Sequence, residues 1–129
     1  MATTSTRNKW VNGVLWLLQV GAALMFAMAA FSKLTGTEEM VELFDVIGIG
    51  QWFRYLTGLL QAIGALLLLV PSLAGFGGLL LASTMFGAVL THLFVIGGSP
   101  LWPLVLFAVT AFIAWGRRPQ WVGAHTERT

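Results

Sequence analysis

The chain has 129 residues, of which 57% are hydrophobic and only 9% are charged, and none is cysteine. Soluble domains carry about 25% charged residues, so this composition disfavours a water-soluble fold, and the length leaves room for one small membrane domain. The missing cysteine excludes disulfides, thiolate nucleophiles, iron–sulfur ligation and covalently attached haem, and the formal charge of +2 does not indicate a nucleic-acid partner, because the basic residues flank hydrophobic segments.

The first predicted element is a membrane-spanning helix over residues 10–33. Its length matches the roughly 20 residues that cross a bilayer, and basic residues lie at both ends, with Lys9 before it and Lys33 at its close. A secretory signal peptide is the alternative, because small residues around Ala27 resemble a cleavage site, yet the apolar part exceeds the usual length of about 7–15 residues. Gln19 lies alone within this span, in its N-terminal half.

Residues 37–48 predict a short amphipathic helix at the membrane interface. Acidic and apolar residues alternate there at helical spacing, among them Glu38, Glu39, Met40, Glu42, Leu43, Phe44, Asp45 and Ile47. Thr37 is a suitable N-cap, and Gly48 is suited to end the helix. A solvated loop with incidental apolar residues is the alternative, because the segment is short.

Residues 55–116 contain no Asp, Glu, Lys or Arg, and this region is long enough for three further membrane crossings. Pro71 and the turn at residues 97–100 divide the region, because proline and glycine interrupt helices. The resulting spans are residues 51–70, 73–96 and 100–116. Short connections make neighbouring spans antiparallel.

Together the elements predict an all-α fold, an integral membrane four-helix bundle with the short interfacial helix between spans one and two, in a single transmembrane domain over residues 1–129. The basic residues of the short flanks predict its orientation. Arg7, Lys9, Arg117, Arg118 and Arg128 lie on one side, whereas Lys33, Arg54 and the loop carboxylates share the other. We therefore expect a multi-pass protein of a bacterial or archaeal cytoplasmic (inner) membrane, with both termini in the cytoplasm.

Polar residues inside the spans are the candidate functional residues, because polar groups are costly in a membrane. In span three, Thr84, Ala88 and His92 are spaced four apart and therefore share one helix face. His92, Arg54 and Lys33 lie at similar depths, so we expect a ligand pocket that opens to the outer leaflet, in which a neutral imidazole exchanges a proton or binds a ligand carbonyl. The candidate ligand-binding residues are His92, Arg54, Gln61, Thr91, Lys33 and Thr57.

A purely structural role for these residues is the alternative. Polar side chains in a membrane bundle hydrogen-bond across helices at about 0.6 kcal/mol each. The cations at the outer surface can pair with the acidic residues of the interfacial helix, Lys33 or Arg54 with Glu38, Glu39 or Glu42. No metal site and no catalytic residue is assigned, and His92 and His125 cannot clasp one haem, because they lie on opposite sides of the membrane.

Three segments carry a family resemblance: Ala30–Leu34 at the close of span one, Thr57–Leu68 with Pro71 in span two, and Gly87–Leu93 in span three. They resemble the DoxX and DoxX-like membrane proteins over most of the chain. The resemblance implies a four-helix membrane bundle, and some members are associated with quinone-linked sulfur oxidation or with membrane complexes that handle oxidative stress. Lys33 and His92 match family positions, whereas Gln61 stands where relatives often carry a glutamate and cannot ionise or transfer a proton.

Three functional hypotheses follow. The first is a subunit or accessory of a membrane redox system, with no covalently bound cofactor and an outer-leaflet pocket for a quinone or another lipophilic molecule. The second is a non-catalytic structural or assembly subunit, whose glycine-rich span three packs against other chains. The third is a small-molecule permease, which needs a continuous polar path that Gln19 alone does not complete. The expected partners are the lipid bilayer and other membrane subunits or further copies of the chain.

Overall fold

The computed structural model describes residues 2–117, with side chains from residue 9 onward, and every regular element in this range is helical. The predicted all-α class is therefore confirmed. The elements are α1 (Ala2–Thr35), α2 (Glu38–Ile47), α3 (Gln51–Leu68), α4 (Ala74–Thr91), the π-helical segment η1 (His92–Ile96) and α5 (Leu101–Gly116). The predicted contributions of Arg7, Arg118, His125 and Arg128 lie outside the described side chains.

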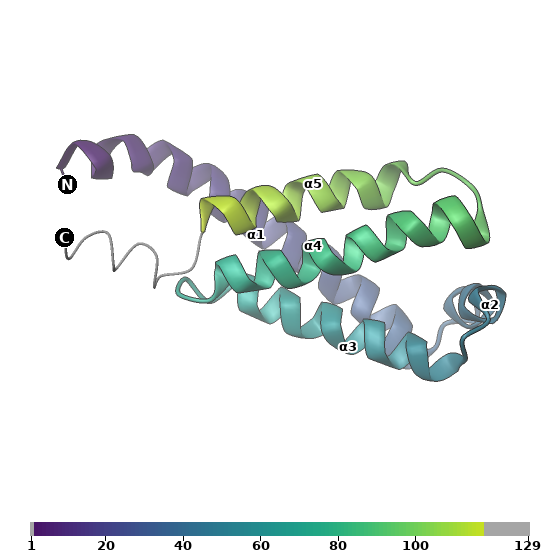
Figure 1. The fold of residues 1–129 in the computed structure, drawn as a ribbon. Coiled ribbons are helices and arrows are strands. Elements are labelled where there is room, and N and C mark those ends of the chain that lie inside the picture. Colours follow the sequence, from purple (N-terminus) through teal and green to yellow (C-terminus); the bar gives the residue numbers. More distant parts are fainter. Residues whose placement is uncertain (1, 118–129) are drawn as a thin grey trace.

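The long helices α1, α3, α4 and α5 pack side by side. Helix α1 packs against α3, α3 against α4 and α4 against α5, and α5 also contacts α1. Figure 1 shows α3 and α4 close together at the hairpin that joins them and farther apart toward α2, which lies across the other end of the group. We call these two ends the hairpin end and the α2 end. The C-terminal ends of α1 and α4 and the N-terminal ends of α3 and α5 meet at the α2 end.

The core is built from all four long helices. Its buried members are Ala22, Ala23 and Phe26 of α1, Ala65 and Leu68 of α3, Leu81 and Met85 of α4, and Ile113 of α5. The outward faces are apolar as well, because large side chains such as Trp10, Leu17, Met28 and Phe94 are exposed. A helix that is apolar all round needs a cover of lipid or of other protein.

Helix α2 forms between the caps that the sequence predicts. The Thr37 hydroxyl accepts a hydrogen bond from Met40 N at 3.4 Å, and Gly48 ends the helix in the left-handed conformation with a φ of 84°. Phe44 is buried, and its ring lies edge-on to that of Phe53 on α3, with centroids 5.9 Å apart. The predicted amphipathic helix over residues 37–48 is thus present as α2 and packs against α3.

The helical stretch Ala74–Ile96 agrees with the predicted span over residues 73–96, but it is not α-helical throughout. The α-helical part ends at Thr91, and His92–Ile96 continue as the π-helical turn η1, after which Gly97 adopts a φ of 73°. A π-turn is wider than an α-helical turn and is frequent at functional sites. Apolar periodicity does not distinguish the two kinds of turn, so no pattern in the sequence predicts η1.

Glycines bring α4 into backbone contact with its neighbours at the hairpin end. A Cβ atom on Gly77 would lie 2.9 Å from the backbone nitrogen of Leu68, and one on Gly78 would lie 2.8 Å from the backbone oxygen of Thr110. Real Cβ atoms do not approach backbone atoms so closely, so glycine is required for this packing of α3, α4 and α5.

We predict that Gly78→Ala lowers the free energy of unfolding by about 1–3 kcal/mol, because the added methyl group forces α4 and α5 apart. Gly21→Ala on α1 is the matched control, since a Cβ there meets nothing within 4 Å. Unfolding in mixed micelles, followed by circular dichroism, measures both variants. Equal stability of the two variants would show that α4 and α5 are not in backbone contact.

Candidate functional site

A cavity of about 690 Å³ lies between the helices at the α2 end, and all five α-helices and η1 contribute to its wall. Its volume falls within the roughly 300–1,000 Å³ that is usual for small-molecule sites. Most of the wall is apolar, with Phe26, Phe44 and Met85 among its members. The polar side chains of the wall are Lys33, Thr57, Gln61, Ser83, Thr84, Thr91 and His92.

The cavity brings together most of the residues that the sequence proposes as a site. Lys33 from α1, Thr57 and Gln61 from α3, Thr91 from α4 and His92 from η1 all line it. Arg54, the sixth candidate, does not line the cavity. Ligand binding by the other five residues stays a prediction, while their common location is a property of the fold.

Arg54 closes the end of α1 instead. The side chain is 5% exposed, and its Nη1 donates a hydrogen bond to the backbone oxygen of Lys33, one of the carbonyls that a helix end leaves unpaired. Its Nε donates to Gln51 Oε1 at 2.7 Å, and Gln51 Nε2 donates to Asp45 Oδ1 at 2.8 Å. Gly36 leaves room for this guanidinium, because a Cβ there would lie 2.9 Å from Nη1. These hydrogen bonds link Arg54 and Gln51 on α3 both to the C-terminal end of α1 and to Asp45 on α2.

The hydroxyl groups of the wall are engaged with their own helix. These groups belong to Thr57, Ser83, Thr84 and Thr91. Each hydroxyl donates its proton to a backbone carbonyl three or four residues earlier, at distances of 2.8–3.0 Å. A hydroxyl in this arrangement keeps its oxygen lone pairs. These groups can therefore accept a hydrogen bond from a ligand and cannot readily donate one.

His92 presents one free ring nitrogen. Its Nδ1 lies 2.9 Å from the backbone oxygen of Ala88. Because a carbonyl oxygen only accepts, this contact assigns the proton to Nδ1 and leaves Nε2 as an acceptor in the neutral ring. Within residues 2–117 no three His, Cys, Asp or Glu side chains gather in a way that would hold a metal ion.

Gln61 is the polar residue of the wall with the least satisfied hydrogen bonding. The side chain is 4% exposed, and its Oε1 is buried without a hydrogen-bond partner among the described residues. Buried polar atoms are nearly always paired, but no described residue forms a hydrogen bond with this amide, so Gln61 is left unpaired in the cavity wall. Because rotation about one bond exchanges the positions of the amide oxygen and nitrogen, Gln61 can present its N–H groups to the cavity that it lines.

Lys33 is the one cationic side chain among the residues of the wall. The predicted ion pairs with Glu38, Glu39 or Glu42 are not formed, and within the described part of the chain no carboxylate pairs with Lys33 or Arg54. The acidic residues of α2 are exposed, with Glu42 among them, and point to solvent rather than to the bundle. The cavity therefore carries one positive charge and no negative one.

Comparison with known proteins decides the family. Residues 17–117, well over half of the chain, match the family model described as DoxX-like. The chain belongs to the DoxX-like family. The matched range contains the whole wall of the cavity, including Lys33 and His92, on which the resemblance in the sequence rested. No curated protein and no solved structure matched the chain.

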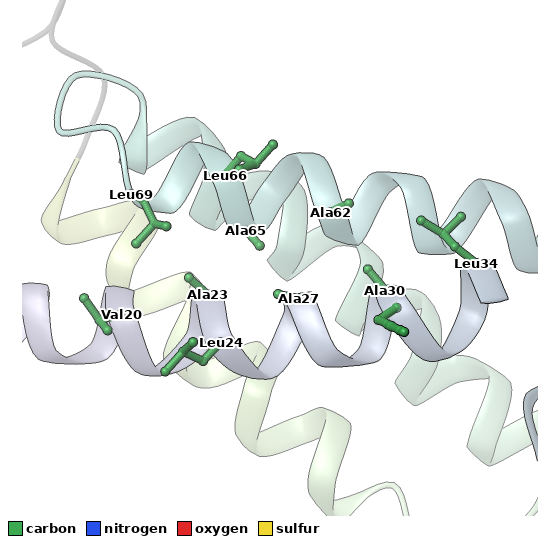
Figure 2. Close-up of a pocket in the computed structure, with 11 residues that line it drawn as sticks. Val20, Ala23, Leu24, Ala27, Ala30, Leu34, Ala62, Ala65, Leu66 and Leu69 are labelled. Atoms are coloured by element: carbon green, nitrogen blue, oxygen red, sulfur yellow. The ribbon is translucent and has the colours of Figure 1, made fainter. Parts of the chain in front are cut away.

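This DoxX-like chain has a second hollow, a groove of about 460 Å³ between α1 and α3 (Figure 2). All of its lining residues are apolar. The groove exists because small alanine side chains lie on both helices: Ala23, Ala27 and Ala30 on α1 face Ala62 and Ala65 on α3. The groove offers no hydrogen-bonding side chain and no charge. It suits a hydrocarbon chain or an apolar helix and carries no chemistry of its own.

Gln19, predicted to stand alone, belongs to a polar cluster at the hairpin end. Its side chain is fully buried; Nε2 donates to the backbone oxygen of Leu68 at 2.7 Å, and Oε1 accepts from Arg117 Nε at 2.7 Å. Arg117 also lies over the ring of Trp16, 5.7 Å from its centroid. Partial burial lowers the pKa of the Arg117 guanidinium, which still remains charged at neutral pH. The cluster joins the ends of α3 and α5 to α1 and leaves no group free for a ligand.

We predict that Gln19→Leu and Arg117→Met are strongly non-additive. Each variant removes the same hydrogen bond, so a double-mutant cycle should give a coupling of about 0.5–3 kcal/mol in the free energy of unfolding. Lys9→Met is the control, because Lys9 is exposed and should add independently to Gln19→Leu. Additivity of Gln19→Leu with Arg117→Met would mean that the two side chains do not interact.

Proposed function

We propose that this DoxX-like protein spans a membrane with α1, α3, α4 and α5 and binds a lipophilic small molecule in the cavity at the α2 end. The observation that carries the proposal is the composition of the cavity wall. It combines an apolar lining of small-molecule size with polar groups from several elements, among them Gln61 and Lys33, which have no side-chain partner among the described residues. Few convergent polar groups in an apolar pocket are typical of ligand sites.

The exposure of the apolar helices supports the membrane assignment. Lys9–Thr35 and Ala74–Ile96 are long and apolar enough to cross a bilayer, and only 33% and 17% of their most apolar windows are buried. The central helix of a soluble protein would be mostly buried instead. Helix α5 is apolar but shorter, and on α3 the polar Arg54 and Gln61 are buried inside the molecule, so they do not face lipid.

The charge distribution supports the orientation predicted from the sequence. Lys9 and Arg117 lie toward the hairpin end, and the acidic helix α2 lies at the other end. The positive-inside rule then puts the hairpin end in the cytoplasm of a bacterial or archaeal cell and the cavity in the outer leaflet of its inner membrane.

A quinone is one ligand that such a cavity can hold, because its carbonyl oxygens accept hydrogen bonds from Lys33 and from the Gln61 amide nitrogen. The proposed role as a subunit or accessory of a membrane redox system is supported by the family resemblance. Gln61 cannot ionise, so this site binds and orients a ligand and does not relay protons through α3. No residue is assigned a catalytic role.

A structural or assembly subunit is the second candidate. The groove between α1 and α3 in Figure 2 favours it, because an apolar hollow lined by alanines accepts a helix from another chain. A permease is less favoured. Along α1 the core residues Ala22, Ala23 and Phe26 lie between the Gln19 cluster and Lys33, and they provide no polar path between the two ends.

We predict that Gly87→Phe weakens ligand binding strongly while the protein still folds. Gly87 lines the cavity, and a Cβ there meets nothing within 4 Å, so the ring can enter the cavity without moving the backbone. Binding of a decyl-chain quinone to the full-length protein in mild detergent, together with mass spectrometry of lipophilic molecules that co-purify, measures the effect. We expect an affinity loss of about tenfold or more.

Gly21→Phe is the matched control, since Gly21 is exposed on α1, away from the cavity, and has equally open surroundings. It should bind the quinone and retain co-purified molecules like the unmodified protein. Retention of both ligands by Gly87→Phe would contradict the proposal. Co-purification of a second protein, with no lipophilic molecule, would favour the structural role instead.

A further inference from the structure

The cavity wall has an unbalanced charge. Lys33 supplies a cation, no Asp or Glu belongs to the wall, and within the described residues Lys33 has no anionic partner. A charge in apolar surroundings is costly unless it is paired, and the usual partner is an anion that shares its hydrogen bonds. The missing partner at this site is therefore negative.

Gln61 provides a second, independent indication. Its side chain is more than nine-tenths buried in the cavity wall, and no described residue pairs with its amide, so its N–H groups are available to an acceptor on a ligand. Lys33 and Gln61 together present N–H donors from two different helices, α1 and α3. The hydroxyl groups of the wall do not compete for the same acceptor, because their protons are already donated to backbone carbonyls.

We propose that the cavity binds a single-chain amphiphile with a carboxylate head, whose two oxygens accept hydrogen bonds from Lys33 Nζ and Gln61 Nε2. The hydrocarbon chain lies against the apolar wall formed by Phe26, Leu60, Leu80, Met85 and Leu106. This inference rests on the proposed function, because it requires the cavity to be a ligand site, and it specifies the chemical class of the ligand.

Charge decides between a carboxylate and the alternatives. A quinone satisfies the same donors but leaves the charge of Lys33 uncompensated. A phosphate monoester carries a charge of about −1.5 to −2 at neutral pH, more than one lysine can neutralise. A two-chain phospholipid matches the charge when its head is monoanionic, so phosphatidylglycerol is included in the test below to distinguish a ligand with one chain from a ligand with two. A monoanionic carboxylate on one chain fits both the charge and the volume.

The test uses tritiated hexadecanoate and the full-length protein in a neutral maltoside detergent, with bound ligand measured by scintillation proximity. Unlabelled hexadecanol, a decyl-chain quinone and phosphatidylglycerol serve as competitors. We expect hexadecanol to compete at least tenfold more weakly than unlabelled hexadecanoate. Lys33→Met should weaken hexadecanoate binding at least tenfold and leave hexadecanol binding unchanged, which also shows that the cavity is intact. Lys33→Arg should restore most of the affinity.

Lys9→Met is the matched control, because it removes an exposed cation from the same helix and should bind hexadecanoate normally. Equal competition by hexadecanol, or full hexadecanoate affinity in Lys33→Met, would overturn the inference. Tritiated hexadecanol, quinone and phosphatidylglycerol are also measured directly, and binding of the quinone or phosphatidylglycerol without hexadecanoate would overturn the inference and leave the proposed ligand cavity standing. Absence of binding by all four probes would overturn both.

Discussion

The close backbone approach of α4 to α3 and α5 at the hairpin end holds the long helices together. Gly77 and Gly78 permit it, because any Cβ there would meet the backbone of the neighbouring helix. Helices α3 and α4 lie close together at the hairpin end and farther apart toward the α2 end, which α2 covers (Figure 1). The cavity occupies the space that results, so the geometry of a few glycines near residue 78 determines the volume available near His92.

Two polar side chains pair with each other at the hairpin end, whereas two in the cavity wall at the α2 end lack side-chain partners among the described residues. At the hairpin end Gln19, Arg117 and the Leu68 carbonyl satisfy one another, which adds stability but leaves nothing to bind a ligand. At the α2 end Gln61 and Lys33 have no partners among the described residues, although both lie in the cavity wall. An unpaired polar group reduces stability, so its presence beside an empty volume supports the proposal that a ligand completes the site.

Local patterns in the sequence were sufficient to predict the helices and their caps. Thr37 and Gly48 delimit α2, and the row of Thr84, Ala88 and His92 faces the cavity because residues four apart share a helix face. The role of Arg54 was not predictable, since its partner is a backbone carbonyl 21 residues earlier at the end of another helix. The pairing of Gln19 with Arg117 joins residues 98 positions apart, and no local pattern signals it.

The claim that the cavity is a ligand site is tested most directly by chemical protection, which the absence of cysteine from the chain makes simple. Ser83→Cys places a thiol in the cavity wall, and Leu79→Cys places one on the same helix one turn earlier, where the side chain is exposed and does not line the cavity. We expect hexadecanoate or a decyl-chain quinone to slow the reaction of N-ethylmaleimide with Ser83→Cys and to leave its reaction with Leu79→Cys unchanged. Equal reaction rates at Ser83→Cys with and without either ligand would contradict it.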